Sequence, residues 1–136
     1  SQIILQADCL LKEVIDQSFD LLVLPGGPAV FDLREKPRVL DLIRRLHFDG
    51  IPIGAICAAP LLLLDAGLLE QGVSYTAHGS TIEELPDLRK DKSTVTHQSI
   101  ITSRGAGTAV GFGLALIEKL FGREKAEEIK ISIHAD

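Results

Sequence analysis

The chain has 136 residues, of which 46% are hydrophobic and 24% charged, which favours one globular domain over residues 1–136 and excludes a disordered chain. The net charge of −5 disfavours a general nucleic-acid binder and a protein attracted to anionic membranes. Cys9 and Cys57 are too few for a disulfide scaffold, and residues 1–20 lack the basic start of a signal peptide, so we expect a cytoplasmic location.

The stretch 51–69 carries a single charged residue, Asp65, and is long enough to span a bilayer. Two prolines and two glycines interrupt it. A buried strand followed by a helix in an α/β core explains the same hydrophobicity, so we expect no membrane-spanning segment.

The first part of the chain predicts two strands with a short helix between them. Residues 2–6 form a strand candidate, and residues 8–17 show apolar positions at helical spacing with Asp8 as the N-cap. Residues 19–24 are almost continuously apolar and end in Pro-Gly-Gly, a pattern typical of a central parallel strand followed by a loop.

The middle of the chain predicts two further helices and a strand. Pro37 suits the first turn of a helix that Gly50 ends. Residues 51–56 form the next strand, and residues 58–66 form a helix closed by Gly67.

The segment after Gly67 is predicted to be more irregular. Residues 73–77 alternate in hydrophobicity like a strand, which ends at His78. Ser80 and Glu83 resemble a capping box before a short helix that Pro86 ends. Residues 87–93 are charged and indicate a surface loop.

The last part predicts a hairpin followed by two helices. Residues 94–96 and 99–102 are short strands, and residues 108–121 and 124–131 are helices separated by Gly122. In the first of these helices, four apolar residues share the face expected to meet the core: Val110, Leu114, Ile117 and Phe121.

Strands that alternate with helices indicate βαβ units, and therefore an α/β fold with a mostly parallel sheet and helices on both faces. In such sheets the functional site lies beyond the carboxyl ends of the strands. Four loops follow predicted strand ends, at residues 25–27, 57–58, 78–79 and 104–105. We expect these loops to converge at one edge of the sheet.

Cys57 is the candidate nucleophile of that edge. It follows the apolar run 51–56 and has small residues, Ala55 and Ala59, two places on either side. A nucleophile at a sharp strand-to-helix turn needs small neighbours, and a thiol at a helix N-terminus is favoured as thiolate. The alternative is a buried structural cysteine.

Backbone N–H groups near Cys57 are candidates for holding a developing oxyanion. Gly26 and Gly27 would present one N–H group, and Ala58 would supply the second. The alternative for the two glycines is an ordinary strand-to-helix turn.

His78 could move a proton or orient the substrate, the alternative being a structural histidine at a strand end. Arg104, before Gly105 and Ala106, could bind a carboxylate or phosphate at a helix N-terminus, the alternative being a solvated arginine. The remaining histidines and Cys9 show no metal-ligand spacing, so we predict no metal site.

Three motifs occur in a characteristic order: Leu21-Leu-Val-Leu-Pro-Gly-Gly27, Gly54-Ala-Ile-Cys-Ala-Ala-Pro60 and Thr102-Ser-Arg-Gly-Ala-Gly-Thr108. They resemble the ThiJ/PfpI superfamily, in the branch of the parkinsonism-associated protein deglycase and its bacterial relatives. The resemblance implies a flavodoxin-like three-layer sandwich, usually a homodimer, with Cys57 as the reactive cysteine. It also implies Gly27 and Ala58 around the oxyanion position and His78 near the thiol.

The chain departs from the family pattern in two places. Ala106 stands where the family usually has proline, which changes the wall of the pocket. The family also begins with a strand–helix–strand unit that contributes the first strand and a glutamate hydrogen-bonded to the thiol. This chain resembles the C-terminal three quarters or so of the domain, and Glu13 lies in the wrong element to replace that glutamate. We therefore expect a separate N-terminal peptide of the same protein to complete the fold.

The resemblance implies a glyoxalase or deglycase that needs no added cofactor and acts on small 2-oxoaldehydes or their adducts. Cys57 would form a hemithioacetal, and hydrolysis would release a hydroxy acid; without the glutamate we expect residues 1–136 alone to be inactive. One alternative is an oxidative-stress sensor or chaperone whose Cys57 is oxidised to sulfinate. Another is a glutaminase-type thiol amidohydrolase, which would need His134 beside Cys57.

Overall fold

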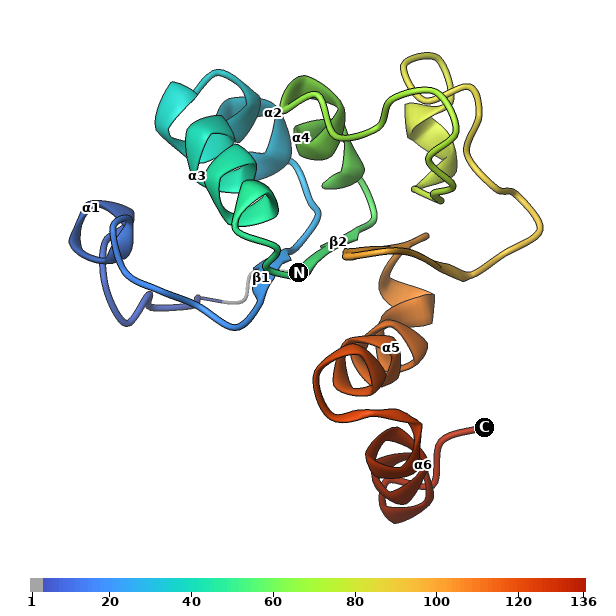
Figure 1. The fold of residues 1–136 in the computed structure, drawn as a ribbon. Helices are drawn as coiled ribbons and strands as arrows, with labels where there is room; N and C mark the ends of the chain where they lie inside the picture. Colours follow the sequence, from blue (N-terminus) through green and yellow to red (C-terminus); the bar gives the residue numbers. More distant parts are fainter. Residues whose placement is uncertain (1–3) are drawn as a thin grey trace.

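The computed structural model describes residues 4–136, which form one sheet with helices packed on its two sides (Figure 1). Its helices are α1 (Leu11–Val14), α2 (Ala29–Arg34), α3 (Pro37–Phe48), α4 (Pro60–Asp65), α5 (Ala109–Phe121) and α6 (Arg123–Ser132). Its strands are β1 (Leu22–Leu24), β2 (Ile53–Ile56), β3 (Thr94–His97) and β4 (Ile100–Ser103). Two 3-10 turns, η1 (Gly79–Thr81) and η2 (Ala106–Thr108), follow the segments that we expected to carry site residues.

Within residues 4–136 the strands lie in the order β1-β2-β4-β3. β1, β2 and β4 are parallel, and β3 pairs with β4 as an antiparallel hairpin. The register places Leu24 beside Ala55 and Ala55 beside Thr102, so the three parallel strands end at the same edge. The predicted α/β fold, the mostly parallel sheet and the hairpin are confirmed.

The two faces of the sheet are covered unequally. Helices α2, α3 and α4 lie over one face, and α5 lies over the other with α6 packed against α5 (Figure 1). The larger hydrophobic core lies under α2, α3 and α4, where Ile43 and Ile53 are fully buried. The smaller core, on the α5 side, consists of Ile101, Phe112 and Leu116 with partly buried neighbours. The sheet therefore has helices on both faces, as predicted.

Helix α3 begins and ends where its sequence predicts, whereas α4 is shorter than the predicted 58–66, because Ala58 and Ala59 still belong to the turn after β2. Pro37 occupies the first turn of α3, and the helix stops before Gly50, which has a φ of +77°. Pro60 begins α4, and Gly67, with a φ of +80°, follows its C-terminal end. A positive φ is a conformation that glycine adopts at little cost, so both glycines are effective helix stops.

The N-terminal elements differ from the prediction. The expected strand over 2–6 falls partly on residues outside those described, and residues 4–6 are not a strand. Ile4 and Leu5 are 96% and 87% exposed, so no neighbouring strand in residues 4–136 pairs with or covers them. The expected helix over 8–17 is reduced to the single turn α1. Its N-cap is Leu10 and not Asp8, because the Glu13 carboxylate accepts the N–H of Leu10.

Residues 73–77 are not a strand, although Tyr75 and Thr76 are buried. In a sheet their backbone N–H groups would donate to carbonyls of a neighbouring strand, but here they donate to side chains. The N–H of Ser74 donates to His97 Nδ1, and the N–H of Thr76 donates to Thr102 Oγ1. The segment lies across the β3–β4 hairpin through these bonds, which is why its alternating pattern did not predict its structure correctly.

Two other local predictions are wrong. The capping box of Ser80 and Glu83 is replaced by η1, whose N-cap is His78, because the imidazole already accepts the N–H of Ser80. On α5 the buried residues are Phe112 and Leu116, whereas Val110 and Phe121 are 56% and 69% exposed.

The short helix α2 was not predicted, since a helix of this length carries too few residues to show a period. Among the described residues, none of the helices has both the length and the apolar character needed to cross a bilayer.

Candidate active site

Cys57 lies at the sharp turn between β2 and α4. Its φ is +66°, a conformation that a residue with a side chain rarely adopts. Two hydrogen bonds hold the turn: the N–H of Cys57 donates to the Ser103 carbonyl at 2.9 Å, and the Cys57 carbonyl accepts the N–H of His78 at 2.8 Å. The thiol is half-buried and belongs to a free cysteine. Strain held by surrounding structure is typical of a nucleophile at a strand-to-helix turn.

Gly26 packs directly against this turn. A Cβ built on Gly26 would lie 2.5 Å from Cys57 Cβ, 2.8 Å from the Ile56 carbonyl oxygen and 3.2 Å from the Ala58 nitrogen. Every larger residue is therefore excluded unless the turn moves. Gly27 follows with a φ of +108°, which also favours glycine.

The N–H groups of Gly27 and Ala58 donate no hydrogen bond to any of residues 4–136. Ala58 is buried, and its nitrogen lies beside Gly26, so the loop after β1 and the turn after β2 meet here. Unpaired backbone donors beside a thiol can hold an oxygen that becomes negatively charged.

His78 is joined to Cys57 through its backbone, and its side chain is exposed. Its Nδ1 accepts the N–H of Ser80 at 3.2 Å and lies 2.8 Å from Ser80 Oγ. Because an N–H donates to Nδ1, the neutral imidazole carries its proton on Nε2, which is the nitrogen left for a ligand.

Arg104, Gly105 and Ala106 share a pocket of about 290 Å³ with His78. A Cβ built on Gly105 would lie 3.6 Å from His78 Cδ2, so the two loops are in close contact. Arg104 donates to the Lys90 carbonyl at 3.3 Å and remains exposed. In the part of the chain that the structure describes, Cys57 does not line this pocket.

The structure thus arranges the predicted site residues in two groups. Gly26, Cys57 and Ala58 form one contact region, which Gly27 joins as the next residue of the chain, and His78 with residues 104–106 forms the other. The backbone bond from His78 to Cys57 connects them. All four loops expected at one edge of the sheet contribute, although residues 73–77 reach it without forming a strand.

Sequence reasoning missed two serines that position these residues. The Ser103 carbonyl holds the N–H of Cys57, and Ser80 fixes the imidazole of His78. Ser80 lies two residues after His78, a spacing typical of side-chain capping of a turn. This spacing is the sequence feature that could have predicted the contact between them. The Ser103 contact comes from strand register, which no local pattern reveals.

His134 follows α6 in the sequence, and α6 packs against α5 on the side away from the sheet (Figure 1). Nothing in this arrangement supports the contact with Cys57 that a glutaminase would need. Within residues 4–136 no group of three or more His, Cys, Asp or Glu side chains could hold a metal ion.

Comparison with known proteins gives one consistent result. The sequence pattern of the DJ-1/PfpI family matches residues 3–119. The chain is 35% identical to Glutathione-independent glyoxalase DJR-1.2 of Caenorhabditis elegans over 125 residues, which cover 90% of this chain and 66% of that protein. It is 36% identical to Deglycase PfpI of Pyrococcus furiosus over 72 residues, covering 52% of this chain and 43% of that protein.

The fold agrees with these similarities. The crystal structure of Drosophila melanogaster DJ-1beta superposes with a TM-score of 0.86 at 37% identity, over 93% of this chain and 69% of that one. The flavodoxin-like architecture predicted from the resemblance is therefore confirmed. The chain spans less than two thirds of the length of both curated relatives described above.

Proposed function

The chain belongs to the DJ-1/PfpI family, and from this membership we propose that it carries the thiol of a cysteine-dependent glyoxalase or deglycase acting on 2-oxoaldehydes or their adducts. The observation that carries the proposal is the φ of +66° at Cys57, held under Gly26 beside the unpaired N–H groups of Gly27 and Ala58. A structural cysteine needs neither the strain nor the unpaired donors.

The proposed reaction begins when the Cys57 sulfur attacks the aldehyde carbon and forms a C–S bond. The aldehyde oxygen gains a proton, which gives a hemithioacetal, while Gly27 and Ala58 donate to that oxygen. A base then removes the proton from the carbon bonded to sulfur and a proton is returned to the neighbouring carbonyl carbon, while the hydroxyl proton passes to the oxygen of that carbon, which leaves a thioester of a 2-hydroxy acid. Water cleaves the thioester, so the net reaction adds one water to the 2-oxoaldehyde, and no oxidant is consumed.

The base for this step is proposed to come from outside the chain. His78 Nε2 assists by exchanging a proton with a substrate oxygen, since Nδ1 is occupied by Ser80. Arg104 and Ala106 would border the substrate in the pocket beside His78. A glutamate on a separate N-terminal peptide of the same protein would act on the carbon.

One feature of the sheet supports such a peptide. β1 pairs with β2 on one side only among the described strands, and Val23 in its middle is 43% exposed. An unpaired strand edge presents N–H and C=O groups that another strand can bind. We propose that the N-terminal peptide adds a strand here, that the completed protein is a homodimer, and that it works in the cytoplasm.

The test is lactate formation from methylglyoxal by the completed protein. We expect Cys57→Ser to abolish turnover, whereas Cys9→Ser, which changes an exposed thiol, leaves it unchanged. Residues 1–136 alone should be inactive. Turnover that survives Cys57→Ser in the completed protein would refute the proposal.

The alternative function is a redox sensor or chaperone, and the half-buried thiol beside unpaired N–H groups supports it as well. There the same donors would stabilise a Cys57 sulfinate formed by peroxide. Peroxide titration with mass spectrometry separates the two functions. Stoichiometric sulfinate at Cys57 in a protein without lactate formation would favour the sensor.

A further inference from the structure

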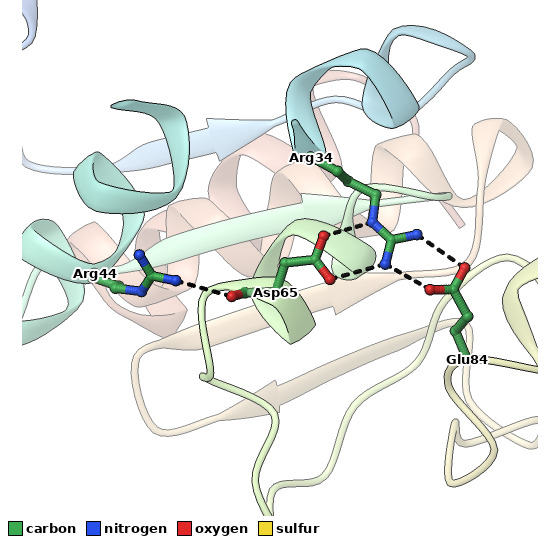
Figure 2. Close-up of polar contacts among 4 residues, drawn as sticks. All are labelled: Arg34, Arg44, Asp65 and Glu84. Carbon is green, nitrogen blue, oxygen red and sulfur yellow. Dashed lines mark hydrogen bonds and ion pairs between the residues drawn. The ribbon is translucent and has the colours of Figure 1, made fainter. Parts of the chain in front are cut away.

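Arg34, at the end of α2, joins two carboxylates from different parts of the chain (Figure 2). Its Nε and Nη2 donate to Asp65 at 2.6 and 2.9 Å, and its Nη1 and Nη2 donate to Glu84 at 2.9 and 2.6 Å. The Arg34 side chain is 20% exposed and that of Asp65 24%, so the pair is largely shielded from water. Both carboxylates raise the pKa of Arg34, and the hydrogen bonds that Arg34 donates to Asp65 contribute most.

Each member of this cluster lies at the end of a segment that starts in the site. α2 begins two residues after Gly27, and α4, which ends at Asp65, begins three residues after Cys57. Glu84 lies six residues after His78. The Arg34 cluster, meaning Arg34, Asp65 and Glu84, therefore ties together the continuations of all three loops that carry the central site residues.

The connection from Glu84 back to Cys57 is a chain of short hydrogen bonds. The Thr81 carbonyl accepts the N–H of Glu84 at 3.1 Å, and the His78 carbonyl accepts the N–H and Oγ1 of Thr81 at 3.0 and 2.8 Å. The N–H of His78 then donates to the Cys57 carbonyl at 2.8 Å. These bonds connect the backbone of Glu84 to that of His78.

The connection through α4 bears on the strain at Cys57. α4 has six residues, too few to hold a helix by its own hydrogen bonds. Besides its buried leucines, it is fixed by Arg34 at the Asp65 side chain and by Arg44, whose Nη2 donates to the Asp65 carbonyl at 3.0 Å (Figure 2). A strained residue keeps its conformation only where both flanking elements are held.

From these contacts we infer that Arg34 is a positioning residue, which holds the Cys57 turn, the Gly27 loop and the His78 loop in register through Asp65 and Glu84. The inference rests on the proposed role of the Cys57 site. Its test measures amide hydrogen exchange, which needs no turnover, so an inactive protein would leave the test of Arg34 intact.

The experiment compares Arg34→Ala, Arg34→Lys and Glu84→Gln in the completed protein by amide exchange followed residue by residue. We expect exchange of the His78 amide to rise about fivefold in Glu84→Gln, the effect of one exposed charged pair, and by more in Arg34→Ala. Arg34→Lys keeps the charge but loses the planar fork, so it should fall between wild type and Arg34→Ala. Amides of the β2–β4 ladder report global opening and should change less than that of His78.

The matched control is Glu83→Gln, which removes the same charge from an exposed neighbour whose side chain makes no hydrogen bond within residues 4–136. It should leave the exchange of His78 unchanged. An equal rise at His78 and in the β2–β4 ladder, or no rise in Glu84→Gln, would show that the cluster only adds stability and would overturn the inference. If Arg34→Ala fails to fold, Glu84→Gln decides the question.

Discussion

At the scale of single residues, the contact between Gly26 and Cys57 sets the geometry of the candidate site. Gly26→Ala would place a Cβ 2.5 Å from Cys57 Cβ and 2.8 Å from a backbone carbonyl, and neither atom is the free end of a flexible side chain. The turn must move, so we expect a loss of about 2–3 kcal/mol in the free energy of unfolding, measured by urea titration.

The control for this substitution is Gly79→Ala, beside His78. Gly79 lies as close to the site in the chain, but a Cβ there meets no heavy atom within 4 Å and its φ is not positive. We expect a change within about 0.5 kcal/mol. Equal costs at Gly26 and Gly79 would mean that the close packing against Cys57 is not what requires glycine.

The residues of the turn were predictable because each has a local signature. Small residues around a cysteine after an apolar run predict a tight strand-to-helix turn, and Gly26 and Gly27 follow a strand. The role of His78 as the cap of η1 was not predictable in the same way, because Ser80 competes as a cap in the sequence and only the fold places its N–H on the imidazole.

At the scale of elements, the approach of α5 to the sheet depends on Gly54 in β2. A Cβ on Gly54 would lie 2.7 Å from Leu116 Cδ2 and 2.9 Å from Phe112 Cζ. Both atoms end buried side chains, which can shift slightly, so Gly54→Ala should cost about 1–2 kcal/mol of unfolding free energy, less than Gly26→Ala.

The matched control lies on the helix itself. A Cβ on Gly113 of α5 meets no heavy atom outside its helix within 4 Å, so Gly113→Ala should stabilise the protein by about 0.5–1 kcal/mol through helix propensity. Both variants are measured by thermal or urea unfolding. If Gly54→Ala instead stabilises the protein, the close approach of α5 to β2 does not depend on the absence of a side chain at Gly54.

The hollow at Gly54 also explains why the buried face of α5 was mispredicted. The helix has apolar residues on several faces, so hydrophobic spacing favours Leu114 and Ile117 as strongly as Phe112 and Leu116. Which of these residues are buried depends on the sheet, because the absence of a side chain at Gly54 leaves space for Phe112. Sequence patterns predicted that α5 exists and where it ends, whereas its rotation depends on a contact between distant residues.

At the scale of the whole molecule, the Arg34 cluster links stability to pH. Arg34, mainly through its hydrogen bonds, holds the pKa of Glu84 below its usual value, and nearby Asp65 opposes this. A carboxylate with a lowered folded pKa stabilises the fold above its unfolded pKa, about 4.3, and loses that effect as the pH falls through the folded pKa.

We therefore expect the difference in unfolding free energy between wild type and Glu84→Gln to be largest at neutral pH and to shrink below about pH 4. Urea titrations at a series of pH values measure it. Asp91 provides a comparison, because Arg89 lowers its pKa to about 2, so any effect of Asp91→Asn should persist to lower pH. A difference for Glu84→Gln that does not depend on pH would contradict the assignment of the lowered pKa.

The sheet as a whole shows the limit of what local sequence can predict. The alternation of strands and helices predicted the α/β fold, and the apolar run before Gly26 predicted a strand with neighbours on both sides. Among the described strands β1 instead lies at the edge of the sheet. Its composition suits a central strand, and the partner on its second side is the one that we propose the N-terminal peptide supplies.

The open edge of β1 leads to a prediction about the isolated chain. Leu24 points into the larger core, whereas Val23 alternates to the opposite face, where α5 packs on β2, β3 and β4. An exposed apolar edge strand pairs readily with a second copy. We expect residues 1–136 to self-associate with rising concentration in sedimentation velocity, and Val23→Lys to weaken this association.

Val110→Lys distinguishes this edge from the other exposed apolar surface. Val110 is 56% exposed on α5, a helix whose main sheet contacts are with β2, β3 and β4, so the substitution adds the same charge to a site outside the strand edge. If Val110→Lys disperses the complexes and Val23→Lys does not, the copies associate through α5. That result would contradict association through the edge of β1. A lysine on an edge strand blocks pairing while changing stability by only about 0.5 kcal/mol. If Val23→Lys alone disperses the complexes, the association therefore depends on the same backbone groups that would bind the N-terminal peptide.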